Sequence, residues 1–156
     1  MINAGISGEE LVDPESGLRN ETALKEDLEW EIARMKRYGH RFAVLMFEPR
    51  TFIPIESCLK LANLVKEILR ATDILYRLPD CRFAAILPCS HETGGECAAL
   101  RLRRVLAKKT EDYPEGPVDI DVGVVSVDIH MQMSSSEIIE KANSELTEAK
   151  HLREAS

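Results

Sequence analysis

Apolar residues recur along the chain with two different spacings, and each spacing predicts one kind of element. Residues 21–37 carry an apolar side chain every three or four positions, which places these side chains on one face of a helix. Residues 42–48 form a nearly continuous apolar run that ends in the carboxylate of Glu48. Such a run is typical of a strand covered on both faces. Gly39, between the two segments, is suited to ending the helix.

The same reasoning predicts the remaining elements. They are a helix within residues 58–73, a hairpin at 73–88, a helix at 92–109, a β-branched strand at 118–128 and a Ser-capped helix within 134–156. The order is therefore helix, strand, helix, hairpin, helix, strand, helix. This order predicts a central sheet with helices packed against it, in an α/β or α+β layer fold.

Size and charge restrict the class of protein. The chain has 156 residues, so we expect one domain at residues 13–156 after an N-terminal tail or linker at residues 1–12. No apolar run approaches the ~20 residues of a membrane span, and no signal peptide is evident, so we expect a cytoplasmic protein without membrane insertion. The net charge of −7 argues against a nucleic-acid partner, which needs excess Lys and Arg.

The cysteines and histidines predict neither metal nor nucleophilic chemistry. The four cysteines form no C-x-x-C pair, so we expect reduced thiols that mostly fill apolar space. Cys89, His91 and Cys97 are close in sequence, but structural zinc requires four ligands at recognisable spacings. The histidines lie in no triad-like or H-E-x-x-H context. We therefore expect no metal and no other cofactor.

Several short motifs follow one another in a fixed order between residues 13 and 150. "DPESGLRNE" forms the turn before the first helix, "EPRTF" ends the first strand, and "RLPDCRFAAILP" forms the hairpin. "IDVGVV" and "ANSELTEAK" lie in the last strand and the last helix. In this order they resemble the GGDEF domain of diguanylate cyclases, which join two GTP molecules into cyclic di-GMP. The resemblance implies a nucleotidyl cyclase-like fold with a mostly antiparallel central sheet flanked by helices.

The hairpin departs from the family's R-x-G-G-D-E-F signature, whose glycines approach the nucleotide and whose acidic residues help to hold Mg²⁺. The glycines correspond to Pro79 and Asp80, and the two acidic residues to Cys81 and Arg82, whereas Glu48 keeps the carboxylate that ends the first strand. Proline lacks an N–H for a phosphate, and cysteine is a poor magnesium ligand. The guanine-reading segment of the family is also missing from "TFIPIESCLK". We therefore expect a degenerate signature with no catalytic residue.

Upstream of the hairpin, "RATD" keeps the R-x-x-D motif at which the product binds and inhibits many diguanylate cyclases. Arg70 and Asp73 are in the family's register, and Arg101 aligns with an arginine that completes this site, often from a neighbouring subunit. A guanidinium can bind the O6 and N7 edge of guanine, and a carboxylate can accept from its N–H edge. Alternatively, Arg70 and Asp73 pair only with each other at the end of a helix.

These features predict a non-catalytic signalling domain that binds cyclic di-GMP through Arg70, Asp73 and Arg101 and acts on a protein partner or an attached domain. Two alternatives stay open. One is a ligand-free interaction or dimerisation module, in which Trp30 packs or contacts a second copy of the chain. The other is an active diguanylate cyclase with an unusual site.

Overall fold

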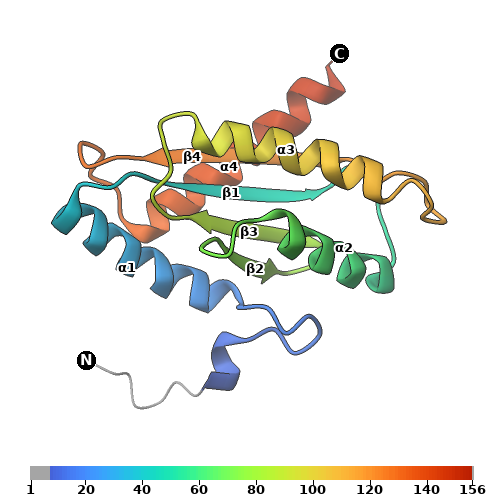
Figure 1. Ribbon diagram of the computed structural model, residues 1–156, viewed down its shortest axis with the longest axis horizontal. Coiled ribbons are helices and arrows are strands. Elements are labelled where there is room, and N and C mark those ends of the chain that lie inside the picture. Colours follow the sequence, from blue (N-terminus) through green and yellow to red (C-terminus); the bar gives the residue numbers. More distant parts are fainter. Residues whose placement is uncertain (1–7, 156) are drawn as a thin grey trace.

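Four strands form one antiparallel sheet in the order β2-β3-β1-β4 (Figure 1). The protein is represented by a computed structural model, which describes residues 8–155. Its elements are η1 (Gly8–Leu11), α1 (Glu21–Tyr38), β1 (Phe42–Pro49), α2 (Ile55–Ile68), β2 (Ile74–Leu78), β3 (Arg82–Leu87), α3 (Gly94–Lys109), β4 (Ile120–Val127) and α4 (Ser135–Glu154). The predicted fold class, an antiparallel sheet flanked by helices, is confirmed.

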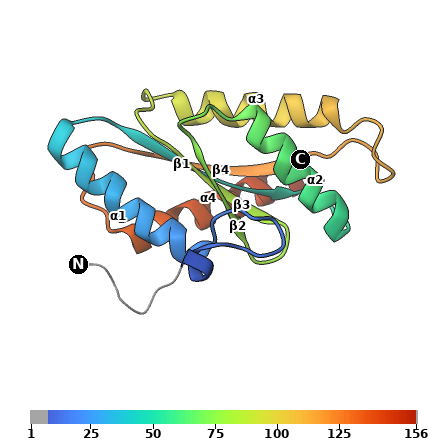
Figure 2. The same cartoon turned by 60° about the horizontal axis from the view of Figure 1, so that its bottom comes forward.

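Helices cover both faces of the sheet, with α2 and α3 on one side and α1 and α4 on the other (Figure 2). The central strand β1 supplies both cores because successive side chains point to opposite faces. Ala43, Leu45 and Phe47 pack in the cluster under α2 and α3. Val44 and Met46 pack in the cluster under α1 and α4. The continuous apolar run is therefore explained by burial on two sides.

The helix ends follow local chemistry that the sequence contains. Asn20 caps α1 because its side chain accepts the N–H of Ala23 at 3.0 Å. Gly39 ends α1 with a left-handed backbone (φ 77°). The second helix, predicted within residues 58–73, spans Ile55–Ile68, so it begins before the predicted segment, and Leu69 is extended. Residues 69–73 instead form the turn into β2.

The N-terminal segment packs on the sheet edge as far as the structure describes it. Of the residues expected to form a tail, Gly8–Leu11 form a short 3₁₀ helix, and residues 1–7 lie outside the described part of the chain. Val12 and Arg19 form an isolated bridge, and Arg19 bridges in turn to Tyr76 of β2. Within residues 8–155, no helix is both long and apolar enough to cross a membrane.

Gly123 of β4 sets how closely α4 approaches the sheet. A Cβ atom at this position would overlap the backbone nitrogen of Leu146 and lie 2.7 Å from the carbonyl oxygen of Ala142. These neighbours are helix backbone and cannot move aside independently. The close contact holds α4 in the position from which its C-terminal half reaches the end of the sheet.

We predict that Gly123→Ala lowers the free energy of unfolding by about 2 kcal/mol, because the added methyl group forces α4 away from β4. Urea denaturation measures the change. Ser144→Ala on the exposed face of α4 is the control and should stay within about 0.5 kcal/mol of the parent. Equal stabilities of the glycine variant and the control would show that α4 does not depend on this approach.

Candidate functional site

The tip of the β2–β3 hairpin is a three-residue loop that a side chain of strand β2 holds in place. Leu78 pairs with Arg82 across the hairpin, and Asp80 has a left-handed backbone (φ 64°), which aspartate tolerates better than most residues. Arg77 donates to the carbonyl oxygen of Asp80 from Nε at 2.8 Å and from Nη2 at 2.6 Å. The arginine is only 7% exposed, so these bonds are shielded from water.

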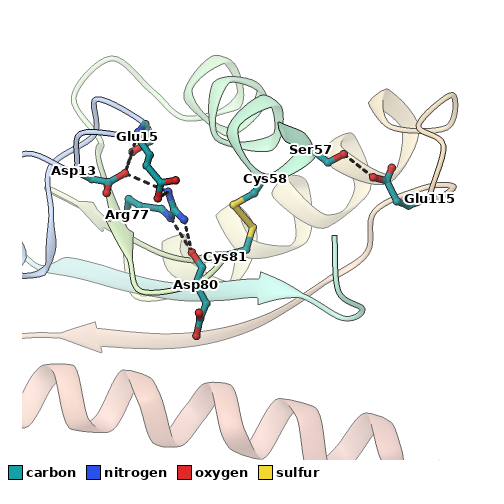
Figure 3. The surroundings of a disulfide bond; sticks show 9 residues. Asp13, Glu15, Ser57, Cys58, Arg77, Asp80, Cys81 and Glu115 are labelled. Carbon is teal, nitrogen blue, oxygen red and sulfur yellow. Dashed lines mark hydrogen bonds and ion pairs between the residues drawn. A yellow bond between two sulfur atoms is a disulfide. The ribbon is translucent and has the colours of Figure 1, made fainter. Parts of the chain in front are cut away.

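Arg77 also ties the tip to the turn that precedes α1. Its Nη1 lies 3.2 Å from Oδ2 of Asp13 and 3.7 Å from Oε1 of Glu15. Figure 3 shows the guanidinium between these carboxylates and the backbone of Asp80. A buried arginine needs such partners, since an unpaired charge in this position would be costly. The tip and the N-terminal turn are therefore held as one unit.

The expectation that all four cysteines are reduced thiols is wrong in the structure, because Cys58 and Cys81 form a disulfide (Figure 3). Their Cα atoms are 5.9 Å apart although 23 positions separate them in sequence. The first turn of α2 lies against the hairpin tip, and this tertiary contact has no signature in the spacing of the cysteines. Cys89 and Cys97 are free and exposed.

Glu48, at the end of β1, is paired with two cations. Its Oε2 accepts from Nε of Arg82 at 3.1 Å, and its Oε1 accepts from Nζ of Lys150 at 2.7 Å. Burial alone would raise the pKa of the Glu48 carboxyl, but the hydrogen bond from Lys150 and the charge of Arg82 hold that pKa below its usual range. Arg82 also donates to Oδ1 of Asn143 at 3.2 Å, which links the hairpin to α4.

A second carboxylate lies directly opposite Glu48, because Asp121 of β4 is its partner in the strand register. Asp121 is 3% exposed and accepts two hydrogen bonds from Arg153 at 2.9 Å each and one from Arg50 at 3.2 Å. Burial alone would raise the pKa of Asp121, but these two arginines hold it below its usual range. Asp121, Arg153 and Arg50 were not among the predicted site residues. The sequence signal that could have indicated these ion pairs is a charged residue, Asp121, inside the β-branched run "IDVGVV".

The residues at the end of β1 do not suit a magnesium ion. Mg²⁺ prefers several oxygen ligands in a near-ideal octahedron, whereas here Glu48 faces Arg82 and Lys150. Across the described residues, no group of three or more His, Cys, Asp or Glu side chains is arranged to hold a metal ion. Internal ion pairs therefore satisfy the carboxylate.

A cavity of about 750 Å³ opens between the hairpin tip and the segment that joins β1 to α2. The tip contributes Asp80 and Cys81, and the facing wall includes Cys58. Phe52 lies on the rim and is 92% exposed. The full lining is Glu15, Glu48, Pro49, Arg50, Thr51, Phe52, Ile53, Ile55, Cys58, Arg77, Asp80 and Cys81.

The three residues predicted to bind a ligand line a second, smaller cavity of about 310 Å³. Arg70 donates from Nη2 to Oδ1 of Asp73 at 3.2 Å and to the carbonyl oxygen of Pro88 at 3.3 Å. The other carboxylate oxygen of Asp73 accepts the backbone N–H of Arg70 at 2.8 Å. Arg101 reaches the same cavity from α3 and donates to the carbonyl oxygen of Ile68 at 3.2 Å. The structure thus brings all three together.

Comparison with known families gives a match along almost the whole chain. The family described as "Diguanylate cyclase, GGDEF domain" matches residues 10–156. The chain belongs to the GGDEF domain family. A comparison with curated protein sequences finds no match.

Solved GGDEF structures share the fold. Diguanylate cyclase SiaD of Pseudomonas aeruginosa, in complex with its activator SiaC, has a TM-score of 0.80 at 22% identity over 90% of this chain. The chain spans only 58% of SiaD. The coiled coil and GGDEF domain of DgcB from Caulobacter crescentus, in complex with c-di-GMP, has a TM-score of 0.79 at 14% identity, covering 92% of this chain and 82% of that one. The FimX GGDEF domain of P. aeruginosa has a TM-score of 0.75 at 17% identity, with coverages of 94% and 95%.

We predict that Arg82→Glu makes the stability of this GGDEF domain depend on magnesium. The substitution sets a second carboxylate beside Glu48 and removes one of its two cations, so Lys150 alone faces two carboxylates and Mg²⁺ can offset the remaining repulsion. A free Mg²⁺ concentration of ~10 times the dissociation constant would add about 1.4 kcal/mol to the free energy of unfolding. Urea denaturation with MgCl₂, and with NaCl at equal ionic strength, measures the difference.

Arg82→Gln is the matched control because it removes the charge without adding a carboxylate. The parent and this control should respond to MgCl₂ as they do to NaCl. A specific stabilisation of the parent by MgCl₂ would contradict the view that ion pairs already satisfy Glu48.

Proposed function

We propose that this chain is a non-catalytic GGDEF signalling domain that binds cyclic di-GMP through Arg70, Asp73 and Arg101. The observation that carries the proposal is the convergence of these three side chains on one cavity from two separate segments, the α2–β2 turn and α3. Arg70 and Arg101 are exposed and can turn toward a ligand.

The chemistry of the cavity suits a guanine base and a phosphate. A planar guanidinium donates two parallel hydrogen bonds to the O6 and N7 edge of guanine, and its face can stack on a base. Asp73 would accept from the opposite N–H edge once its bonds with Arg70 rearrange, since both of its carboxylate oxygens accept from Arg70. Arg70 would exchange its bond with the Pro88 carbonyl for bonds with the ligand, which costs little at a half-exposed site.

The arrangement at the hairpin supports the non-catalytic part of the proposal. Phosphoryl transfer depends on metal ions that neutralise the triphosphate and on backbone groups that approach it. Here Glu48 is paired with Arg82 and Lys150, and the tip contains Pro79 and a disulfide-bonded Cys81. Each feature removes a contact that the reaction would need.

The comparison structures support a ligand and a partner of this kind. DgcB was solved in complex with c-di-GMP, and SiaD in complex with an activator protein. By analogy, we propose that ligand binding to this domain, working in the cytoplasm, changes its contact with a protein partner or an attached domain. The comparison with DgcB and SiaD is an analogy between folds. The proposal therefore depends mainly on the residues Arg70, Asp73 and Arg101.

A ligand-free interaction module is the second candidate, and two observations favour it. The Asp73 side chain is 2% exposed and is already bonded to Arg70, so the motif also serves as a local helix end. Trp30 is 71% exposed on α1, which leaves a large apolar side chain for contact with a partner or a second copy of the chain. Under this candidate the cavity binds no nucleotide.

We predict micromolar binding of cyclic di-GMP by isothermal titration calorimetry, weakened at least ~10-fold in Arg70→Ala, because each charged hydrogen bond contributes about 1.5 kcal/mol or more. Arg101→Ala should weaken binding in the same direction. Arg104→Ala is the control, since Arg104 is exposed on the same helix and does not line the cavity. Absence of heat at high ligand concentration, or equal loss in the control, would favour the interaction module.

A further inference from the structure

We propose that Cys58 and Cys81 form a reversible thiol–disulfide couple that opens and closes the 750 Å³ cavity beside the hairpin tip. Both cysteines line this cavity. Cys81 belongs to the hairpin tip, and Cys58 belongs to the first turn of α2, which follows the loop that forms the facing wall. The disulfide therefore joins the hairpin tip covalently to the first turn of α2 (Figure 3).

The two cysteines differ in solvent exposure, and this difference determines which sulfur atom a reductant attacks. Cys58 is 1% exposed, whereas Cys81 is partly exposed. A thiol that enters the cavity therefore meets the sulfur of Cys81. Cys58 lies in the first turn of α2 and belongs to the buried hydrophobic cluster, so it is shielded from an entering thiol. The difference in access therefore favours attack at Sγ of Cys81.

The proposed step uses a dithiol reductant and balances as follows. A thiolate of the reductant attacks Sγ of Cys81, the disulfide breaks, and Sγ of Cys58 leaves with the electron pair and takes a proton from water. The second thiol of the reductant then attacks the reductant's own sulfur in the mixed disulfide and releases Cys81, which is protonated in turn. The reductant becomes an intramolecular disulfide, and the protein gains two electrons and two protons.

Reduction would leave unequal restraints on the two walls. Arg77 still binds the carbonyl oxygen of Asp80, so the tip keeps one anchor. The start of α2 keeps the hydrogen bond from Ser57 to Glu115, at 2.6 Å, but its N-cap is Pro54, which provides no side-chain capping bond. The loop between β1 and α2 and the first turn of α2 are therefore the part that moves, and the cavity widens on that side.

The reversibility argument rests on the cytoplasmic location proposed above. Disulfides in that compartment are usually transient and serve redox sensing or catalysis. The couple is separate from the proposed cyclic di-GMP site, since the two cavities share no lining residue. Failure of nucleotide binding would therefore leave this proposal intact, and the reverse also holds.

The experiment uses the full chain with Cys89→Ser and Cys97→Ser, which removes the two exposed thiols and keeps the couple. Alkylation followed by intact mass spectrometry counts free thiols before and after dithiothreitol in native buffer. Hydrogen exchange is measured in both states. We expect no free thiol before reduction, two after it, and several-fold faster exchange at residues 51–59 with little change in β4. Adding Cys81→Ser should give the fast exchange in both conditions.

Three results would overturn the proposal. Two alkylated thiols before any reductant would show that the couple does not form. Reduction that requires denaturant would show a permanent structural bond. Unchanged exchange at residues 51–59 after complete reduction would show that the bond does not control the cavity. Cyclic di-GMP titrations of the oxidised and reduced states use the chain that keeps Cys89 and Cys97, because both line the nucleotide cavity. The two titrations should agree, which separates local opening from general unfolding.

Discussion

Two carboxylates placed directly opposite each other, Glu48 on β1 and Asp121 on β4, determine the chemistry at one end of the sheet. Like charges opposite each other in a strand pair are destabilising. At a separation of roughly 5 Å and an effective dielectric constant of about 20, two unit charges repel by about 3 kcal/mol. Nearby cations offset that repulsion. The chain supplies them itself: Arg82, Lys150, Arg50 and Arg153.

These ion pairs connect distant parts of the chain. Lys150 and Arg153 lie three positions apart on α4, so one helix reaches both carboxylates. The approach of α4 depends in turn on the absence of a side chain at Gly123. Arg82 brings the hairpin to the same place. The hairpin tip is then restrained from three sides, by Arg82, by Arg77 and by the disulfide of Cys81. In a nucleotide-processing site, bound metal ions would offset part of the negative charge of the carboxylates. Here side chains of the protein provide the charge balance.

Much of the fold could be predicted from sequence because it depends on local patterns. The apolar spacing in α1, the two-sided burial of β1 and the Ser134 cap of α4 all have signals within a few residues. The family resemblance assigned Arg70, Asp73 and Arg101 to one ligand site, with Arg101 often from a neighbouring subunit, and in the structure the three line one cavity of a single chain. The disulfide and the trio around Asp121 could not be predicted, because each joins residues that only the tertiary structure brings together. The apolar repeat of the second helix continues through Leu69, where the backbone has already become extended, so the repeat alone does not locate the end of this helix.

We propose that the hairpin end of the sheet does not bind Mg²⁺ and GTP, because Arg82 and Lys150 already pair with Glu48. The most direct test is an NMR titration of the ¹⁵N-labelled chain with Mg²⁺ and a non-hydrolysable GTP analogue. We predict that the backbone amide signals of Glu48, Cys81 and Arg82 do not shift in a saturable way. A saturable shift of these three signals that requires Mg²⁺ would show that the hairpin end binds the metal and the nucleotide, contrary to the proposal.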